Sequence, residues 1–349
     1  MDYKVTIGIP VYNDMRGIRL MLDSVLGQTF PDIEYLICDD CGTDHSIDVV
    51  KEYQQTHPRG KNIRILHQPH NMGIGAGRNR MMAEAKGQYF YSVDADDTIA
   101  PNTIELLYNT AQKYHAEIVY GSYERLYLFD GKCVNRVPTS YPMKVFNSSD
   151  EFAMYVYYTG IQGMNWNYLM DLDVVRRNQL QVTPVGHGYG EDFTYTIDLP
   201  TYVSSAVLLP DITYQYYNRK VSDYKKKTKI LSREQFMLSI DAVNKKKARK
   251  ELKGKPYYAK RISLLMMIDC SFACEMLKKR ADFDVPFTNC EIRDVMWHPM
   301  SLWEILTSNS ARKQNLLYYL IGKLPLVLSI LSLRLMANRY SKVYEDILF

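Results

Sequence analysis

YFYSVDADDTIAPNT, residues 89–103, packs three carboxylates into four residues directly after an apolar run. The apolar run is typical of a buried β-strand, and Asp94, Asp96 and Asp97 follow where that strand should end. In a D-x-D segment, residues i and i+2 lie on one side of an extended chain, so Asp94 and Asp96 face the same point. Two such hard oxygen donors are typical of a site for Mg²⁺ or Mn²⁺.

The first 120 residues alternate strand and helix patterns around this segment. The helix patterns show apolar residues at helical spacing, as at Ile18, Leu22, Val25 and Leu26. The predicted strands are 5–13, 33–40, 62–68 and 87–93, and the predicted helices after the first are 44–55, 75–85 and 101–114. Alternation of this kind predicts an α/β fold, a parallel sheet covered by helices.

Polar, charged and glycine residues gather where the predicted strands end. They form the segments 10–14, 38–44, 70–80 and 94–97. In open α/β sheets, ligands bind in the crevice at the carboxyl ends of the strands. The four segments therefore predict one ligand site at one edge of the sheet.

The pattern changes along the remaining chain. From 121 to 218 short strands mix with helices, and after about Tyr224 the chain becomes basic and helical, with lysine-rich runs at 225–229 and 244–255. We predict a first domain over 1–224, with halves of about 1–120 and 121–224, and a helical, basic and amphipathic C-terminal region over 225–349.

Composition narrows the class of protein. The chain has 349 residues, 46% hydrophobic and 23% charged, as in ordinary globular proteins, and its net charge of +4 is too small to indicate nucleic acid as a partner. Its six cysteines form no dense framework, which favours a reducing cytoplasm. The single C-x-x-C, Cys38 and Cys41, has no second copy, so we do not expect a zinc or redox site. The N-terminus runs into a strand, and we expect no signal peptide.

The acidic cluster has two other interpretations when taken alone. Aspartates suit helix N-caps, so 94–97 is also compatible with a solvated turn before the helix at 101–114. VDADDT further fits the D-x-D-x-T pattern of haloacid-dehalogenase-like phosphotransferases, but that pattern normally ends the first strand of its fold and here ends the fourth.

The strand-end segments decide between these interpretations. IPVYND, ICDDCGTD, NMGIGAGRNR and YSVDADD resemble, in order and spacing, the motifs of family 2 glycosyltransferases of the GT-A fold. The resemblance continues at 165–180, 188–199 and 211–223, and covers about residues 3–223. Two positions depart from the family pattern: Tyr168 stands where lysine is common, and Cys41-Gly42 where glycine-serine is usual.

The resemblance implies a reaction and its partners. A sugar would pass, with inversion, from a nucleotide diphosphate sugar, favouring a UDP-sugar, to a hydroxyl of a saccharide or polyprenyl-linked saccharide in surface polysaccharide synthesis. Mn²⁺ or Mg²⁺ held by Asp94 and Asp96 would bridge the two phosphates and act as a Lewis acid. A non-catalytic nucleotide- or sugar-binding module remains the alternative from another class.

The resemblance also assigns the nucleotide site. Arg78 would reach toward the nucleotide, and a pairing with the strand-end aspartates is compatible with that role. Gly73, Gly75 and Gly77 fit close packing better than a phosphate loop. Base and nucleotide contacts are expected from Pro10, Val11, Tyr12, Asp39, Asp40, Asn71, Gly73, Arg78, Asp94 and Ala95, with Asp40 accepting from uracil.

The acceptor site is expected at 188–199. Asp192 would be the catalytic base, and adjacent Glu191 would lie on the acceptor side without sharing that role, because neighbouring residues at a helix start point about 100° apart. The alternative interpretation is that the pair only caps a helix dipole. His187 is expected to be a loop histidine without a catalytic role, with a contact to the diphosphate or acceptor as the alternative. Trp166 is expected either as a sugar-stacking floor or as a core residue.

The C-terminal region carries an apolar stretch at 316–333. It is eighteen residues long and contains Lys323 and Pro325, and a lysine in mid-span costs ~3 kcal/mol on insertion. A helix lying in the membrane interface, near the lysine runs, is expected rather than a span, with core packing as the alternative. The protein is thus predicted to be cytoplasmic and peripheral on the inner face of the membrane.

Overall fold

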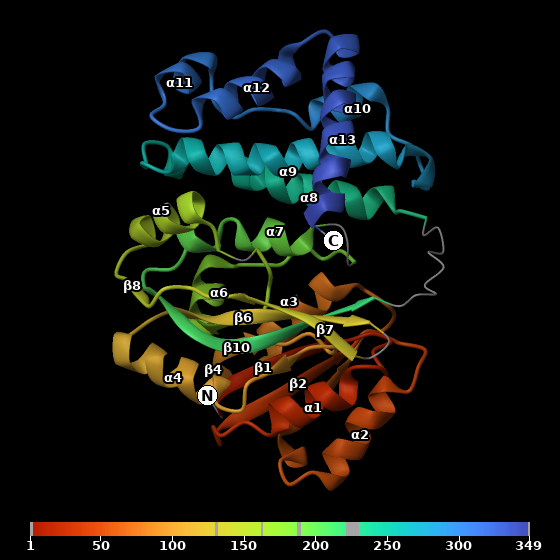
Figure 1. Cartoon of the computed structure of the whole chain (residues 1–349), viewed down its shortest axis with the longest axis vertical. Helices are drawn as coiled ribbons and strands as arrows, with labels where there is room; N and C mark the ends of the chain where they lie inside the picture. Colours follow the sequence, from red (N-terminus) through yellow and green to blue (C-terminus); the bar gives the residue numbers. More distant parts are fainter. Residues whose placement is uncertain (1–2, 130–131, 162, 187–189, 221–229, 348–349) are drawn as a thin grey trace. The chain divides into compact units, whose positions relative to one another are not determined.

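A computed structural model describes residues 3–129, 132–161, 163–186, 190–220 and 230–347 (Figure 1). The chain divides into two compact units, one of residues 1–152 and 162–225, the other of residues 153–161 and 226–349. The boundary expected at 224 falls outside the described residues and stays a prediction.

One sheet organises the first unit (Figure 1). Its order is β3-β2-β1-β4-β9-β6-β10-β5, with β7 paired to β6 and β8 to β10. The first four strands are parallel neighbours, and β9 joins both β4 and β6 in antiparallel pairing. The strands are β1 (Tyr3–Val11), β2 (Ile33–Asp39), β3 (Ile63–His67), β4 (Gly87–Ser92), β5 (Thr98–Ile99), β6 (Ile118–Phe129), β7 (Lys132–Thr139), β8 (Lys144–Phe146), β9 (Tyr168–Asp171) and β10 (Ala206–Lys220).

Helices cover the sheet, with α1 and α2 on one face and α3 on the other (Figure 1). Helix α1 buries Ile18, Met21, Leu22, Val25 and Leu26, the face that its spacing predicts, and each such side chain stabilises the fold by roughly 1.5–3 kcal/mol. The α-helices before β10 are α1 (Ile18–Leu26), α2 (Ser46–Thr56), α3 (Ile74–Glu84), α4 (Thr103–Tyr114), α5 (Ser149–Thr159), α6 (Leu172–Asn178) and α7 (Glu191–Thr196). Residues 153–159 of α5 are part of the second unit.

The carboxyl ends of the parallel strands meet at one edge of the sheet. Strands β1, β2, β3 and β4 end at Val11, Asp39, His67 and Ser92, and the register places Val11 opposite Asp39 and Asp39 opposite His67. The predicted α/β class, with a mostly parallel GT-A-like sheet and a helical C-terminal region, is confirmed. The motifs after the strands therefore lie along a shared edge.

The second unit is helical. Helix α9 contacts α8, α10, α12 and α13, and a buried ion pair joins Lys247 of α8 to Asp269 of α9 at 2.5 Å. The helices are α8 (Arg233–Lys247), α9 (Tyr258–Lys278), α10 (Asn289–Asp294), α11 (Leu302–Thr307), α12 (Arg312–Lys323) and α13 (Leu326–Ile347).

The apolar stretch 316–333 is not one helix. Helix α12 ends at Lys323 and α13 begins at Leu326, because Pro325 has no N–H to continue the ladder. Within the ranges described, every helix falls short of the length or the hydropathy that a membrane span requires.

Candidate functional site

Arg78 is the centre of the site. Its side chain projects from α3, only 2% of the residue is exposed, and its Nη2 donates to Asp94 Oδ1 at 2.9 Å. The Nη1 donates to Asp192 Oδ1 at 3.0 Å and lies 3.8 Å from Glu191 Oε1. The structure therefore shows the expected pairing of Arg78 with carboxylates, which joins the D-x-D-D segment to the start of α7, while its reach toward the nucleotide stays a prediction.

Charge explains why a guanidinium is stable here. Burial alone would lower the pKa of Arg78, but the carboxylates of Asp94, Asp192 and Glu191 outweigh it and raise the pKa above its usual value. Arginine suits this position because its planar fork offers several donors to separate carboxylates at once.

Strand β10 holds the rest of the acidic segment. Asp97 is fully buried and accepts hydrogen bonds from the Tyr214 hydroxyl and the Tyr217 amide, both at 2.8 Å. Burial, with the charges of Asp94 and Asp96, raises the pKa of Asp97 well above its usual value. Asp97 thus anchors the acidic segment to β10.

Arg219 forms an ion pair with Asp96 that the sequence did not suggest. Its Nη1 lies 3.0 Å from Asp96 Oδ2, and its guanidinium also lies over the Tyr217 ring. Each of the two predicted metal ligands is therefore paired with one arginine. The only sequence signal was the position of Arg219 inside the 211–223 segment.

Asp94 and Asp96 fit a divalent ion as a partial ligand set. Their side chains are 23% and 46% exposed. Among the described residues, no three histidines, cysteines or carboxylates gather closely enough to hold a metal. Mg²⁺ and Mn²⁺ accept such a set, because they take oxygen ligands and fill remaining positions with water and substrate phosphates.

Asp14 is a further carboxylate beside this pair. Burial raises its pKa to about 6, with added contributions from the charges of Asp96, Asp94 and Asp44. Gly17 lets the start of α1 approach, since a Cβ there would lie 2.5 Å from Asp96 Cα. The asparagine-aspartate pair after β1 was the available signal for Asp14, although the family motif drew attention to Pro10, Val11 and Tyr12 instead.

A pocket at the β1–β2 edge contains part of the predicted base site. Val11 and Asp39 line it, together with Asn13, Gly42, Asp44 and residues of α2. Of the other expected contacts, Pro10 is half-buried and Tyr12 is exposed, and neither lines this pocket.

Asp40 accepts two backbone hydrogen bonds, and its expected contact with uracil stays a prediction. Its Oδ1 accepts from the Met72 amide at 2.7 Å and its Oδ2 from the Gly73 amide at 3.0 Å, while burial raises its pKa. It holds the loop before α3 because it points inward. Asp39 instead lines the pocket and accepts from the Cys41 amide and His67.

The glycines before and in α3 serve close packing. Gly73 has φ +86°, and a Cβ there would lie 2.9 Å from the backbone of Val185 and Gly186. A Cβ on Gly75 would lie 2.0 Å from the Thr183 carbonyl oxygen. The packing interpretation is thus supported at Gly73 and Gly75, and the expected nucleotide contact of Gly73 stays a prediction; Asn71, also expected at the nucleotide, is exposed nearby.

Trp166 and Ala95 lie in the core. Trp166 is 2% exposed and stacks on Tyr214 with ring centroids 4.2 Å apart, so it offers no open face to a sugar. Of the two roles expected for Trp166, the structure supports the core position, and the sugar-stacking role is wrong because both faces of the ring lie in the core. Ala95 is likewise buried between the two aspartates, and its side chain is not exposed to a ligand.

Glu191 and Asp192 differ in how far their side chains are exposed, as expected for adjacent residues at the start of a helix. The Glu191 side chain is 4% exposed and that of Asp192 28%. Burial, followed by the charge of Asp192, raises the pKa of Glu191 to about 7. Asp192 is therefore the more accessible carboxylate, as its predicted role requires, whereas Glu191 is buried beside Arg78 and its expected place at the acceptor stays a prediction. His187 lies outside the described residues.

Comparison with known proteins gives one family. Residues 6–163 match the family model described as glycosyl transferase family 2. The chain is 25% identical over 224 residues to a protein named uncharacterized glycosyltransferase YibD of Escherichia coli (strain K12), which covers 63% of this chain and 62% of that protein. It is 36% identical over 121 residues to the poly(ribitol-phosphate) beta-glucosyltransferase of Bacillus spizizenii, covering 34% of this chain and 19% of the relative.

A solved structure shares the fold. The match is S. aureus TarS 1–349 in complex with UDP-GlcNAc, with a TM-score of 0.62, 17% identity and coverage of 91% of this chain and 90% of that one. The chain spans less than two thirds of the length of the curated relatives named above. The motifs at 165–223 lie beyond the end of the family match.

Proposed function

The chain belongs to glycosyl transferase family 2, and on this premise we propose that it transfers a sugar from a nucleotide diphosphate sugar to an acceptor hydroxyl. The observation that carries the proposal is the position of Arg78 between Asp94 and Asp192. The buried guanidinium of Arg78 thereby joins Asp94, the carboxylate proposed for the diphosphate, to Asp192, the carboxylate proposed for the acceptor. A transferred sugar would lie between the diphosphate and the acceptor.

Asp94 and Asp96 are the proposed ligands of a divalent metal ion. Mn²⁺ or Mg²⁺ bound there would supply Lewis-acid stabilisation of the leaving diphosphate. Arg78 and Arg219 neutralise these carboxylates on their protein side, which limits repulsion between them and an anionic donor.

Asp192 is the proposed base. It takes the proton of the acceptor hydroxyl while the acceptor oxygen bonds to the anomeric carbon and the bond to the diphosphate breaks, so attack from the opposite side inverts that carbon. Arg78 holds the carboxylate in one orientation at 3.0 Å, and a positioned base of this kind accelerates a reaction by about 10²–10⁴.

A UDP-sugar is the proposed donor. The TarS structure of the same fold contains UDP-GlcNAc, which supports uridine as the base. We place the base in the pocket lined by Val11, Asn13 and Asp39, which Asp40 does not line.

The proposed acceptor is a saccharide or lipid-linked saccharide at the inner face of the membrane. The second unit supports this location because Val327, Leu328, Leu331 and Leu335 are exposed on one face of α13, with Arg334 exposed beside them. Apolar and cationic side chains together suit an interface with anionic headgroups.

Nucleotide release from a panel of UDP-, GDP-, dTDP- and CMP-sugars, with and without Mn²⁺, tests the function. We expect metal-dependent release from one donor, increased by a suitable acceptor. Phosphate release from simple phosphoesters, with no nucleotide released from any sugar donor, would instead favour the phosphotransferase interpretation.

A further inference from the structure

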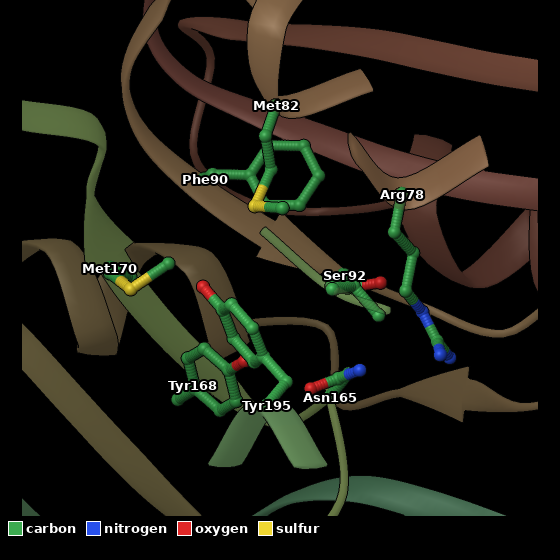
Figure 2. A pocket seen from close by; sticks show the side chains of 9 residues that line it. Arg78, Met82, Phe90, Ser92, Asn165, Tyr168, Met170 and Tyr195 are labelled. Atoms are coloured by element: carbon green, nitrogen blue, oxygen red, sulfur yellow. The ribbon is translucent and has the colours of Figure 1, made fainter. Parts of the chain in front are cut away.

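A small cavity adjoins Arg78 (Figure 2). Three of its polar side chains come from separate parts of the chain: Ser92 ends β4, Asn165 precedes β9, and Tyr195 belongs to α7. Figure 2 shows Ser92 and Asn165 between Arg78 and the tyrosines. The cavity thus joins the strand before the acidic segment to the helix that carries Asp192.

These side chains hold polar atoms that are buried and unpaired. Arg78 Nε, Ser92 Oγ, both amide atoms of Asn165 and the Tyr195 hydroxyl make no hydrogen bond to any residue in the described ranges. The four residues are 2%, 5%, 3% and 5% exposed. Because buried polar groups nearly always have partners, such a cluster around one cavity indicates a polar ligand.

The size of the cavity limits that ligand. It offers about 10 Å³ to the centre of a water molecule, close to the space that one buried water needs. Met82, Phe90, Met170 and Val182 form apolar walls that leave no room for a sugar or a phosphate. Water also matches the polar atoms, since it can accept from Arg78 Nε and donate to Asn165 Oδ1.

We propose that this cavity holds one ordered water molecule that links Arg78 Nε to Asn165, Ser92 and Tyr195, and that these three are positioning residues. The terminal nitrogens of Arg78 already hold Asp94 and Asp192. A partner for Nε fixes the remaining edge of the planar guanidinium, so both carboxylates keep one geometry. The water itself is independent of the proposed function, whereas its kinetic consequence rests on that function.

A high-resolution crystal structure of the full chain tests the water directly. We expect a spherical density peak within hydrogen-bonding distance of Arg78 Nε and of at least two among Ser92, Asn165 and Tyr195. A cavity without density, or side chains paired directly with one another, would overturn the proposal whatever the activity of the protein.

Kinetics of two variants test the positioning role. Asn165→Leu and Tyr195→Phe should lower kcat about tenfold while the KM for the donor changes less than about twofold, since the loss would affect the transition state and not donor binding. Met170→Leu, in the same wall but without a polar atom, should keep the wild-type kcat, and thermal unfolding checks that each variant folds.

The outcomes separate the two proposals. Density for the water together with unchanged kcat in both variants would refute the positioning role. If the wild type released no nucleotide from any donor, the proposed function would fail, and the density would still decide the question of the water.

Discussion

Arg78 is a residue that few substitutions can replace. It is buried, and its terminal nitrogens contact carboxylates from two separate segments. Removing one member of a buried ion pair typically costs about 3–5 kcal/mol, and the cost here should be smaller because water reaches the partners Asp94 and Asp192, which are 23% and 28% exposed.

We therefore expect Arg78→Ala to lower the melting temperature by several degrees and to reduce nucleotide release at least a hundredfold. Arg78→Lys keeps the charge but not the fork, so it should regain stability more than activity. Thermal unfolding and the donor assay measure the two effects. An Arg78→Lys variant with wild-type turnover would contradict the bridging role.

Glu191 should make stability depend on pH. Its pKa rises from 4.5 to about 7 on folding, mainly through burial. Between these values the native state binds more protons than the unfolded chain, so the free energy of unfolding falls as pH rises through this window. The contribution is fully favourable only below about pH 4.5, where both states are protonated.

Replacing this carboxyl tests the sign. We expect Glu191→Gln to gain stability relative to wild type by a few degrees as pH rises from 5 to 8, measured by thermal unfolding at each pH. Glu52→Gln, an exposed change on α2, should show no such gain. A difference between Glu191→Gln and wild type that stays constant over this range would argue against a raised pKa.

At the scale of elements, α3 packs closely against the segment before α7 because Gly75 has no side chain at the point of contact. The close approach of Gly75 to the Thr183 carbonyl leaves no space for a methyl group. Asn79 of α3 adds two hydrogen bonds to Val182, at 2.7 and 2.8 Å. The position of Asp192 thus depends on a contact made by α3.

Gly75→Ala should lower the melting temperature and the rate of nucleotide release together. Gly77→Ala on the same helix is the matched control, because its Cβ would approach the side chain of Cys38, 3.3 Å from the sulfur, and no backbone outside the helix, and alanine favours helix by about 1 kcal/mol. Equal behaviour of the two variants would rule out the packing role of Gly75.

The elements were more predictable from sequence than the contacts within the site. Alternating strand and helix patterns located β1 to β4 and α1 to α4 within a few residues, because burial of one face sets the period. The partners of Asp40, Asp97 and Trp166 were not predictable, since each is decided by residues far away in sequence. The D-x-D-D motif did not reveal that Asp97 points inward to β10.

At the scale of the molecule, the second unit predicts membrane attachment. We expect the full chain to sediment with vesicles containing anionic lipid and not with neutral ones. Val327→Glu with Leu335→Glu should abolish binding by charging the exposed face of α13, while Ile230→Glu, an exposed apolar position elsewhere in this unit, should not. Equal binding of all three proteins would exclude this face as the docking surface.

Calorimetric binding of UDP, with Mn²⁺ or with chelator, to wild type, Asp96→Asn and Asp192→Asn tests the central claim most directly. We predict binding that needs the metal, is weakened at least tenfold in Asp96→Asn and is kept in Asp192→Asn, whose sugar transfer is lost. UDP binding that is equal with chelator, or unaffected by Asp96→Asn, would contradict the assignment of the acidic segment to a metal and a diphosphate.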